Sequence, residues 1–394
     1  MRSLALLSAM LVLSSAMLRA QQTCANYSIV INTPEDKLML AVNGAHSPQE
    51  QVSALKKFIQ AYPNSPYLPC AEEYLTRADV KLGQYSEAIA AGQKAIAAHY
   101  LDILFLEDLL KAYIASGQAT SPAFDILAMA PAEIARESQV ARSTGTSAAA
   151  YQQMVKQAQA TAQGEDDFMQ YAFFQLLAHV TDPNRRIADL GKFSQAYPAE
   201  AQKNAALIDY QYALAYTALN QTQKADQYAE KTLAADPDNV DALNLLAFDY
   251  ALERRTHLDR AEADAQKVLR LVPTLTKPAG ATDAQFQAEQ SNLLGVAHFV
   301  LGFIDLLRAS SGKRYATHAQ MAPAIAQLDS ARQLLAHNPR LEGGVLFYLG
   351  SAYEGEYPAE HRAALAVLEQ AVSLASPWQA PARELLVRVR RVAR

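Results

Sequence analysis

The chain has 394 residues, of which 51% are hydrophobic and 19% are charged. This composition supplies enough apolar side chains for a buried core and excludes intrinsic disorder as a description of the whole chain. The formal net charge of −5 at pH 7 argues against a protein that binds nucleic acid or an anionic membrane surface. Only 15 residues are glycine, and a glycine-poor chain favours helices over collagen-like structures.

Residues 1–20 have the order of a secretory signal peptide, with a basic start at Arg2, an apolar run over 4–13 and small residues after it. The apolar run is shorter than the roughly 20 residues that a membrane-spanning helix needs. We expect cleavage after Ala20, with Ala16 as the second option, and no membrane insertion of the mature chain. The predicted protein is therefore exported, and we expect it in the periplasm rather than outside the cell.

The two cysteines, Cys24 and Cys70, both lie near the start of the predicted mature chain. In an exported protein such a pair is typical of one disulfide. A lipid anchor on Cys24 is the alternative, but Gln21-Gln22-Thr23 does not fit the Leu-small-small pattern that precedes a lipidated cysteine. The chain has no Cys-x-x-Cys pair that would indicate redox catalysis.

One stretch of sequence occurs twice. Residues 55–63 read LKKFIQAYP and residues 190–198 read LGKFSQAYP, so seven of nine positions are identical at an offset of 135. Each stretch predicts an amphipathic helix that ends before a proline, because proline cannot continue a helix. The match indicates one structural unit used more than once.

A shorter period is visible in residues 206–239, 240–273 and 343–377, and more weakly in 69–102. The recurring residues are Tyr212-Ala213, Tyr216, Ala225, Ala229 and Pro237 in the first segment, Leu246-Ala247, Tyr250, Ala261, Ala265 and Pro273 in the second, and Leu349-Gly350, Tyr353, Ala364, Leu368 and Ala371 in the third. The second segment carries about two extra residues near Arg254. This order resembles the tetratricopeptide repeat, a helix-turn-helix unit of about 34 residues.

The resemblance implies an all-α fold, a tetratricopeptide-type α-solenoid of helix-turn-helix repeats in two lobes. We expect an N-terminal helical-repeat lobe over 21–137 and a C-terminal lobe over 166–394. Between them, the small and polar residues that begin at Ser138 predict a linker or irregular helical segment over 138–165.

The sequence shows no catalytic pattern. No two of the eight histidines are three or four residues apart, so no helical metal pair is present. Carboxylate pairs such as Glu72-Glu73 are typical of helix caps and solvated helix faces. We therefore predict that the protein is not an enzyme and has no catalytic residues, no metal site and no cofactor.

In tetratricopeptide proteins the first helix of each repeat lines a concave groove. Carried onto this chain, the resemblance implies a partner-binding groove that includes Tyr210, Leu214, Thr217, Asp241, Asn244, Phe248, Phe347 and Ser351. The alternative interpretation of each aromatic residue is packing against a neighbouring helix.

These observations predict a non-catalytic scaffold of the bacterial cell envelope that binds a protein or peptide partner in its groove. The alternative is a helical-repeat protein that binds a small ligand or a glycan, for which the 19 tyrosines would supply stacking platforms. A nucleic-acid partner is not expected, because the chain is acidic.

Overall fold

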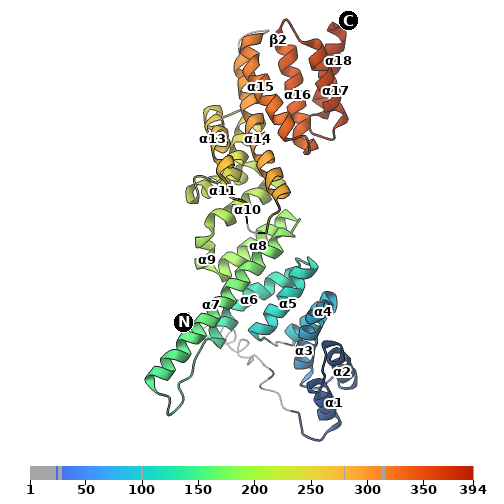
Figure 1. Ribbon diagram of the computed structural model, residues 1–394, viewed down its shortest axis with the longest axis vertical. Coiled ribbons are helices and arrows are strands. Elements are labelled where there is room, and N and C mark those ends of the chain that lie inside the picture. The colour runs from blue at the N-terminus through green and yellow to red at the C-terminus, as the bar shows by residue number, and fades with distance from the viewer. Residues whose placement is uncertain (1–23, 25–28, 99–100, 279, 312–315, 394) are drawn as a thin grey trace, which may run out of the picture. The chain divides into compact units, whose positions relative to one another are not determined.

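The computed structural model describes residues 24, 29–98, 101–278, 280–311 and 316–393, which fold almost entirely into helices (Figure 1). The expected all-α class is therefore confirmed. Contacts divide the chain into two compact units, Met1–Lys203 and Asn204–Arg394, called unit 1 and unit 2 below. The predicted signal peptide, residues 1–20, lies outside the described residues.

Unit 1 consists of consecutive helices that pack side by side with their neighbours in the chain. They are α1 (Pro34–Asn43), α2 (Pro48–Ala61), α3 (Leu68–Lys81), α4 (Tyr85–Ala97), α5 (Ile103–Ser116), α6 (Ser121–Glu137), α7 (Ala148–Ala178), α8 (Pro183–Ala196) and α9 (Pro198–Lys203). In the first part of this unit, the buried side chains of Leu55, Phe58 and Leu75 join α2 to α3 in one apolar cluster.

Unit 2 is a series of four helical hairpins, α10 with α11, α12 with α13, α14 with α15 and α16 with α17, closed by α18 (Figure 1). Its elements are α10 (Ala205–Ala218), α11 (Thr222–Ala235), α12 (Val240–Phe248), the π-helical turn η2 (Asp249–Glu253), α13 (Leu258–Leu271), the 3₁₀ turn η3 (Val272–Thr274), α14 (Asp283–Ser310), β1 (Ala316–Thr317), α15 (His318–Leu334), α16 (Pro339–Gly355), β2 (Glu356–Tyr357), α17 (His361–Ser373) and α18 (Gln379–Val392). The two short strands pair in parallel, with Ala316 opposite Glu356.

Small residues let the helices of a hairpin approach closely. A Cβ atom added to Gly302 of α14 would lie 2.7 Å from Cγ of Leu328 in α15, and one added to Gly350 of α16 would lie 2.6 Å from Cγ of Leu368 in α17. Gly350 stands at a small position of the recurring pattern, so the pattern marks a point of close helix packing.

Helix ends follow the local sequence. Ser47, Asp182 and Asn338 each accept a backbone N–H hydrogen bond with their side chains at the start of a helix. Each is followed by a proline in the first turn, where the missing N–H has no intrahelical partner to lose. These caps explain why α2, α8 and α16 begin where they do.

The helix α14 is long and apolar enough to cross a membrane by length and composition, and 56% of its most apolar window is buried inside the structure. Phe299, Val300 and Phe303 of this helix are almost fully buried among the neighbouring helices of unit 2. The apolar character of α14 is thus explained by its place in the core of unit 2.

The expected boundary between the lobes, in residues 138–165, differs from the boundary between the units, which follows Lys203. Most of the expected linker belongs to α7, whose second half buries Met169, Phe173 and Leu177 against α5 and α6. This apolar contact ties residues 166–203 to unit 1 rather than to the C-terminal lobe. The short polar stretch that begins at Ser138 is only the connection from α6 to α7.

Candidate binding groove

A cavity of about 510 Å³ lies along the first helices of the four hairpins in unit 2 and is called the groove below. Its lining residues are Tyr210, Thr217, Asn220, Thr222, Ala225, Asp226, Asp241, Asn244, Leu245, Phe248, Asp249, Glu253, Asn292, Leu293, Val296, Arg340, Leu341 and Pro377. Most of them come from α10, α12 with η2, α14 and α16. Because the first helix of every hairpin contributes, the groove is a product of stacking rather than of any single repeat.

Tyr210 of α10 and Asp241 of α12 join two neighbouring hairpins across the groove. The Tyr210 hydroxyl donates a hydrogen bond to the Asp241 carboxylate. Burial, and then the nearby carboxylate of Glu289, raise the pKa of Asp241, while the hydrogen bond from Tyr210 lowers it. Burial also raises the pKa of Tyr210, so its hydroxyl stays protonated and can act as the donor.

Asn244 lies one turn further along α12, and only 6% of its surface is exposed. Its Nδ2 donates a hydrogen bond of 3.0 Å to the backbone carbonyl of Leu293 in α14. This bond fixes the orientation of the amide, and the buried Oδ1 has no hydrogen-bond partner in the described part of the chain. A buried acceptor without a partner is costly, which makes Oδ1 a candidate to accept an N–H from a ligand.

Phe248 forms part of the apolar wall of the groove, together with Leu245 and Val296. Its ring meets the buried ring of Phe299 edge to face, with 6.0 Å between the ring centroids. Phe248 is partly exposed, so one side of the ring packs on the core and the other side is available to the groove.

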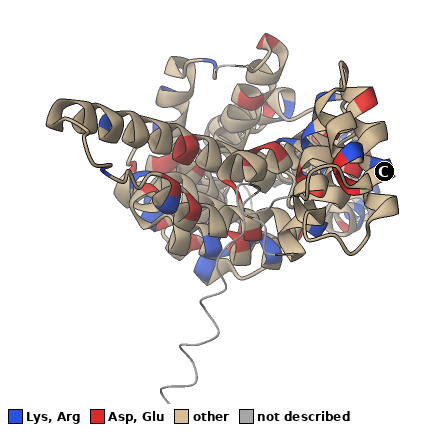
Figure 2. Ribbon diagram, turned by 90° about the horizontal axis from the view of Figure 1, so that it is seen from below, with Lys and Arg blue, Asp and Glu red and all other residues tan. Residues whose placement is uncertain are grey.

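One end of the groove is acidic, with Asp226, Asp249 and Glu253 among its lining residues. Arg254 pairs with Asp226 and with Asp249, which neutralises part of this charge. Elsewhere on the molecule, basic and acidic residues are interspersed along the helices (Figure 2). The acidic end was not predicted from the sequence.

In the sequence, only the extra residues near Arg254 in the second repeat indicated that the acidic end of the groove departs from the repeat pattern. They correspond to the π-helical turn η2 and to left-handed backbone at Arg255 and His257, with φ of 54° and 50°. A π-helical turn absorbs an inserted residue and turns the following side chains to a new direction. Asp249 and Glu253, the first and last residues of this turn, both line the groove.

The structure places five of the eight residues proposed from the sequence in the lining of the groove, namely Tyr210, Thr217, Asp241, Asn244 and Phe248. The other three do not line it. Leu214 is half-buried on α10, the Phe347 ring packs against Tyr348 at 4.9 Å between centroids, and the Ser351 hydroxyl donates a 2.9 Å hydrogen bond to the Phe347 carbonyl of its own helix. For Phe347 the interpretation as a packing residue therefore fits its contacts.

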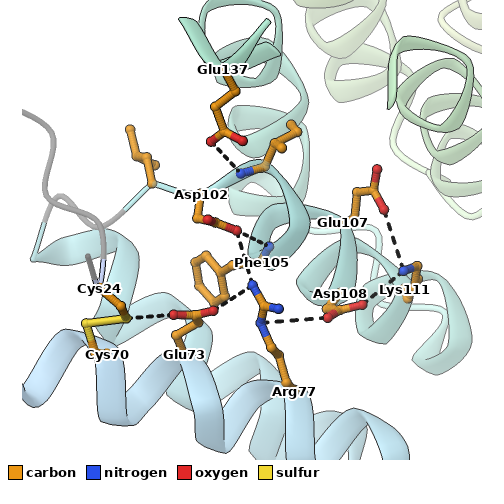
Figure 3. Close-up of polar contacts among 12 residues, drawn as sticks. Cys24, Cys70, Glu73, Arg77, Asp102, Phe105, Glu107, Asp108, Lys111 and Glu137 are labelled. Carbon is orange, nitrogen blue, oxygen red and sulfur yellow. Dashed lines mark hydrogen bonds and ion pairs between the residues drawn. A yellow bond between two sulfur atoms is a disulfide. The ribbon is translucent and has the colours of Figure 1, made fainter. Parts of the chain in front are cut away.

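Cys24 and Cys70 form a disulfide in unit 1, with 5.5 Å between their Cα atoms (Figure 3). This bond ties the segment before α1 to the start of α3, where Cys70 is fully buried. Among the described residues, no group of three or more His, Cys, Asp or Glu side chains is placed to hold a metal ion.

No protein-family description and no curated protein sequence matches the chain. Solved structures with related folds include a chain of the APC/C hetero-tetramer Cut9-Hcn1, at 13% identity over 90% of this chain and 54% of that chain, with a TM-score of 0.36. A tetratricopeptide repeat protein from Parabacteroides merdae has 14% identity over 90% and 96% of the two chains, with a TM-score of 0.30. The P58(IPK) TPR domain has 12% identity over 92% and 98%, with a TM-score of 0.28.

The chain spans about half the length of the Cut9-Hcn1 chain that it matches. The structure consists of stacked helical hairpins with small residues where their helices pack closely. These features confirm the tetratricopeptide-type α-solenoid expected from the sequence.

Proposed function

We propose that the protein is a non-catalytic scaffold whose groove in unit 2 binds an extended segment of a partner protein. The observation that carries the proposal is the Asn244 side chain, which is held by the Leu293 carbonyl and leaves a buried acceptor at the groove. An extended peptide supplies backbone N–H groups at regular intervals, and one of them would satisfy this acceptor. The partly exposed ring of Phe248 beside it offers an apolar contact for a neighbouring side chain.

The proposal is tested by photo-crosslinking in intact cells. A photo-reactive amino acid is placed at Thr217 or Asn292, both exposed residues of the groove, and at Gln266, an exposed residue of α13 that does not line it. We expect a discrete crosslinked protein from the two groove positions and none from Gln266. Equal crosslinking from all three positions would contradict the proposal.

Variants then test whether the groove itself makes the contact. We expect Asn244→Leu to reduce the crosslink from Thr217 at least about fivefold, because the acceptor is lost while the side-chain volume is nearly kept. Arg340→Glu, which changes an exposed residue of the lining, is the second variant and keeps the core intact. Both variants are first compared with the wild-type protein in a thermal melt. A crosslink that persists in both would overturn the assignment.

The alternative of a glycan or small ligand has weaker support in the groove. Tyr210 is the one tyrosine among its described lining residues, and its hydroxyl already donates to Asp241. Tyr212 and Tyr216 each stack on Tyr228, with 4.7 and 5.4 Å between the ring centroids, and none of the three lines the groove. A melting shift with soluble sugars, lost in Phe248→Leu, would nevertheless favour this alternative over the peptide.

We also propose that the protein works in the bacterial envelope, in the periplasm. This rests on the signal-peptide pattern of residues 1–20 and on the Cys24–Cys70 disulfide, a bond that persists in oxidising compartments. N-terminal sequencing of protein from a periplasmic extract should begin at Gln21, or at Met17 if cleavage follows Ala16. Protein that retains residues 1–20 in the cytoplasm, or two reactive thiols in the denatured unreduced protein, would contradict this location.

A further inference from the structure

Unit 1 has a cavity of its own, of about 460 Å³, called the α5–α7 cavity below. It lies between the start of α5, the end of α6 with the residues after it, and the middle of α7. The lining residues are Leu104, Glu137, Ser138, Val140, Met154, Gln157, Ala158, Thr161, Ala162 and Glu165. None of them lines the groove of unit 2, so the cavity is a separate candidate site.

The rim of this cavity is apolar and unusually open to solvent. Leu104 is 52% exposed and Met154 is 46% exposed, although both are large hydrophobic residues. Val140 and Ala158 add to the same wall. Exposed apolar side chains that gather at one cavity indicate a contact surface rather than scattered surface residues.

Glu165 of α7 is the buried charge of the cavity. It is 9% exposed, and in the described part of the chain it makes no hydrogen bond and no ion pair. A carboxylate that has little access to solvent and no partner is costly in its charged form.

Three of the carboxylates that act on Glu165, those of Asp102, Glu107 and Glu137, have partners of their own, which Figure 3 shows in part. Glu137 accepts from the backbone N–H of Ile103 at 3.2 Å and from Arg136 at 3.0 Å. Three nearby cations are paired with carboxylates: Arg136 with Glu133 and Glu137, Arg77 with Glu73 and Asp102, and Lys111 with Glu107 and Asp108. The cavity keeps an uncompensated negative charge.

The pKa of Glu165 reflects this environment. Burial, and after it the neighbouring carboxylates, together raise this pKa to about 7. The contributing neighbours are Glu107 of α5, Glu137 of α6, Asp166 of α7 and Asp102, which caps α5. Deprotonation near neutral pH therefore creates a buried charge that a cation from outside would stabilise.

We propose that the α5–α7 cavity binds the side chain of a lysine presented by a partner peptide. The ammonium group would lie against Glu165 and Glu137, and the methylene stem with the residues beside the lysine would cover Leu104 and Met154. An ammonium is a compact charge with three donors that can serve two carboxylates at once, and its stem is apolar. The proposal is independent of the groove and can fail while the groove assignment stands.

Isothermal titration calorimetry of the full protein tests this with two heptapeptides that carry one lysine between two leucines, one with a free lysine and one with acetyl-lysine. At about pH 8 and low salt, we expect the free lysine to bind at least about tenfold more tightly, because acetylation removes the charge. In Glu165→Gln the difference should fall below about twofold, whereas Asp167→Asn, an exposed neighbour on the same helix, should leave it unchanged.

The pH dependence follows from the same carboxylate. Affinity for the lysine peptide should fall several-fold between about pH 8 and pH 6 as Glu165 takes up a proton, and Glu165→Gln should remove this dependence.

A second pair of variants changes the exposed rim of the cavity and leaves Glu165 unchanged. Leu104→Lys places an ammonium at the exposed rim and should abolish peptide binding, whereas Leu104→Gln should weaken it only partly.

Several outcomes would overturn the proposal. One is equal binding of the two peptides, and another is unchanged lysine selectivity in both Glu165→Gln and Leu104→Lys. If 1,5-diaminopentane displaces the peptide completely at a similar concentration, the ligand of the cavity is a free diamine and not a peptide lysine. The Glu165→Gln variant should keep the partner crosslink formed from position 217. This result would show that the α5–α7 cavity and the groove act separately, so that the lysine proposal can fail without affecting the groove.

Discussion

The two helices that share the repeated sequence, α2 and α8, show how far a local pattern determines structure. Each has 14 residues, begins at a proline and ends before a tyrosine. The backbone angles of the terminal tyrosines are almost the same, with φ −129° and ψ 62° at Tyr62 and φ −127° and ψ 63° at Tyr197. The same residues therefore produce the same helix at two places in the chain.

What surrounds the two helices is different. Phe193 of α8 stacks on Phe173 of α7 with 4.1 Å between the ring centroids, and the buried Tyr197 donates a 3.1 Å hydrogen bond to the carbonyl of Leu127 in α6. Phe58 of α2 is equally buried, but Tyr62 is only half-buried. The local sequence thus sets the helix, while the neighbouring helices set how much each side chain contributes to stability.

The largest effect is expected when the central phenylalanine of each helix is removed. Phe58→Ala and Phe193→Ala should each lower the free energy of unfolding by about 3–5 kcal/mol, because both rings are buried and leave a cavity. We expect the loss at Phe193 to be larger by about 1 kcal/mol, because this ring stacks closely on Phe173, whereas the rings that Phe58 contacts are tilted or edge-on and further away.

Urea unfolding of the full-length protein, followed through the transition of unit 1, measures the change in the free energy of unfolding for both variants. Gln60→Ala and Gln195→Ala are the matched controls, since these glutamines are identical in the two copies and exposed in both. A loss at Gln60 or Gln195 as large as that at the phenylalanines would mean that the packing described for α2 and α8 is wrong.

An effect of intermediate size on stability is expected at two buried aspartates. Asp79 lies in α3, which packs on α2, and Asp189 lies in α8. Asp189 is paired with Arg185 at 3.5 Å and with Lys192 at 4.0 Å. Asp79 is fully buried, and its carboxylate oxygens have no hydrogen-bond partner in the described residues. Burial therefore raises the pKa of Asp79 to about 6.

A raised pKa means that the folded state holds the proton more tightly than the unfolded state. Stability is then fully present below the ordinary pKa of about 4, falls as the pH rises to about 6, and stays low above it. Asp79→Asn should therefore stabilise the protein by about 1–2 kcal/mol at pH 7.5 and have little effect near pH 4. Asp189→Asn is the comparison: burial raises the pKa of Asp189 as well, but its pairs with Arg185 and Lys192 lower it, so its gain at pH 7.5 should be smaller than that of Asp79→Asn. Urea unfolding at both pH values checks this, and a gain from Asp79→Asn that does not change with pH would contradict it.

The smallest effect separates the two terminal tyrosines. Tyr197→Phe should lower the free energy of unfolding by about 1 kcal/mol, because the Leu127 carbonyl loses its donor in a buried place. Tyr62→Phe should change it by less than about 0.5 kcal/mol, because that tyrosine is half-exposed. Thermal melts of both variants give the measurement, and equal losses would remove the distinction between the two copies.

The sequence was informative where a feature depends on neighbouring residues in the chain. The repeated pattern predicted the hairpins α10–α11, α12–α13 and α16–α17. The pattern did not reveal that α14 forms a fourth hairpin with α15, because these helices have 28 and 17 residues and do not fit a 34-residue period. Likewise, the small polar residues that begin at Ser138 suggested a long linker, although α7 begins at Ala148.

The residues of the groove were likewise predicted from the sequence only in part. Repeat positions brought Asn244 and Phe248 to the groove, since the face of a helix follows from its period of 3.6 residues. Phe347 and Ser351 occupy matching repeat positions but lie away from the cavity, because the depth of the groove at α16 depends on how the hairpins stack.

By itself, then, the sequence determined the helical class, the ends of helices such as α2 and α8, and which helix of each hairpin faces the groove. The tertiary structure alone decided the unit boundary after Lys203, the free acceptor of Asn244 and the unpaired charge of Glu165. The physical reason is that helix propensity, caps and periodicity act over a few residues. Burial and charge pairing instead depend on side chains from α5, α6 and α7, which only packing brings together.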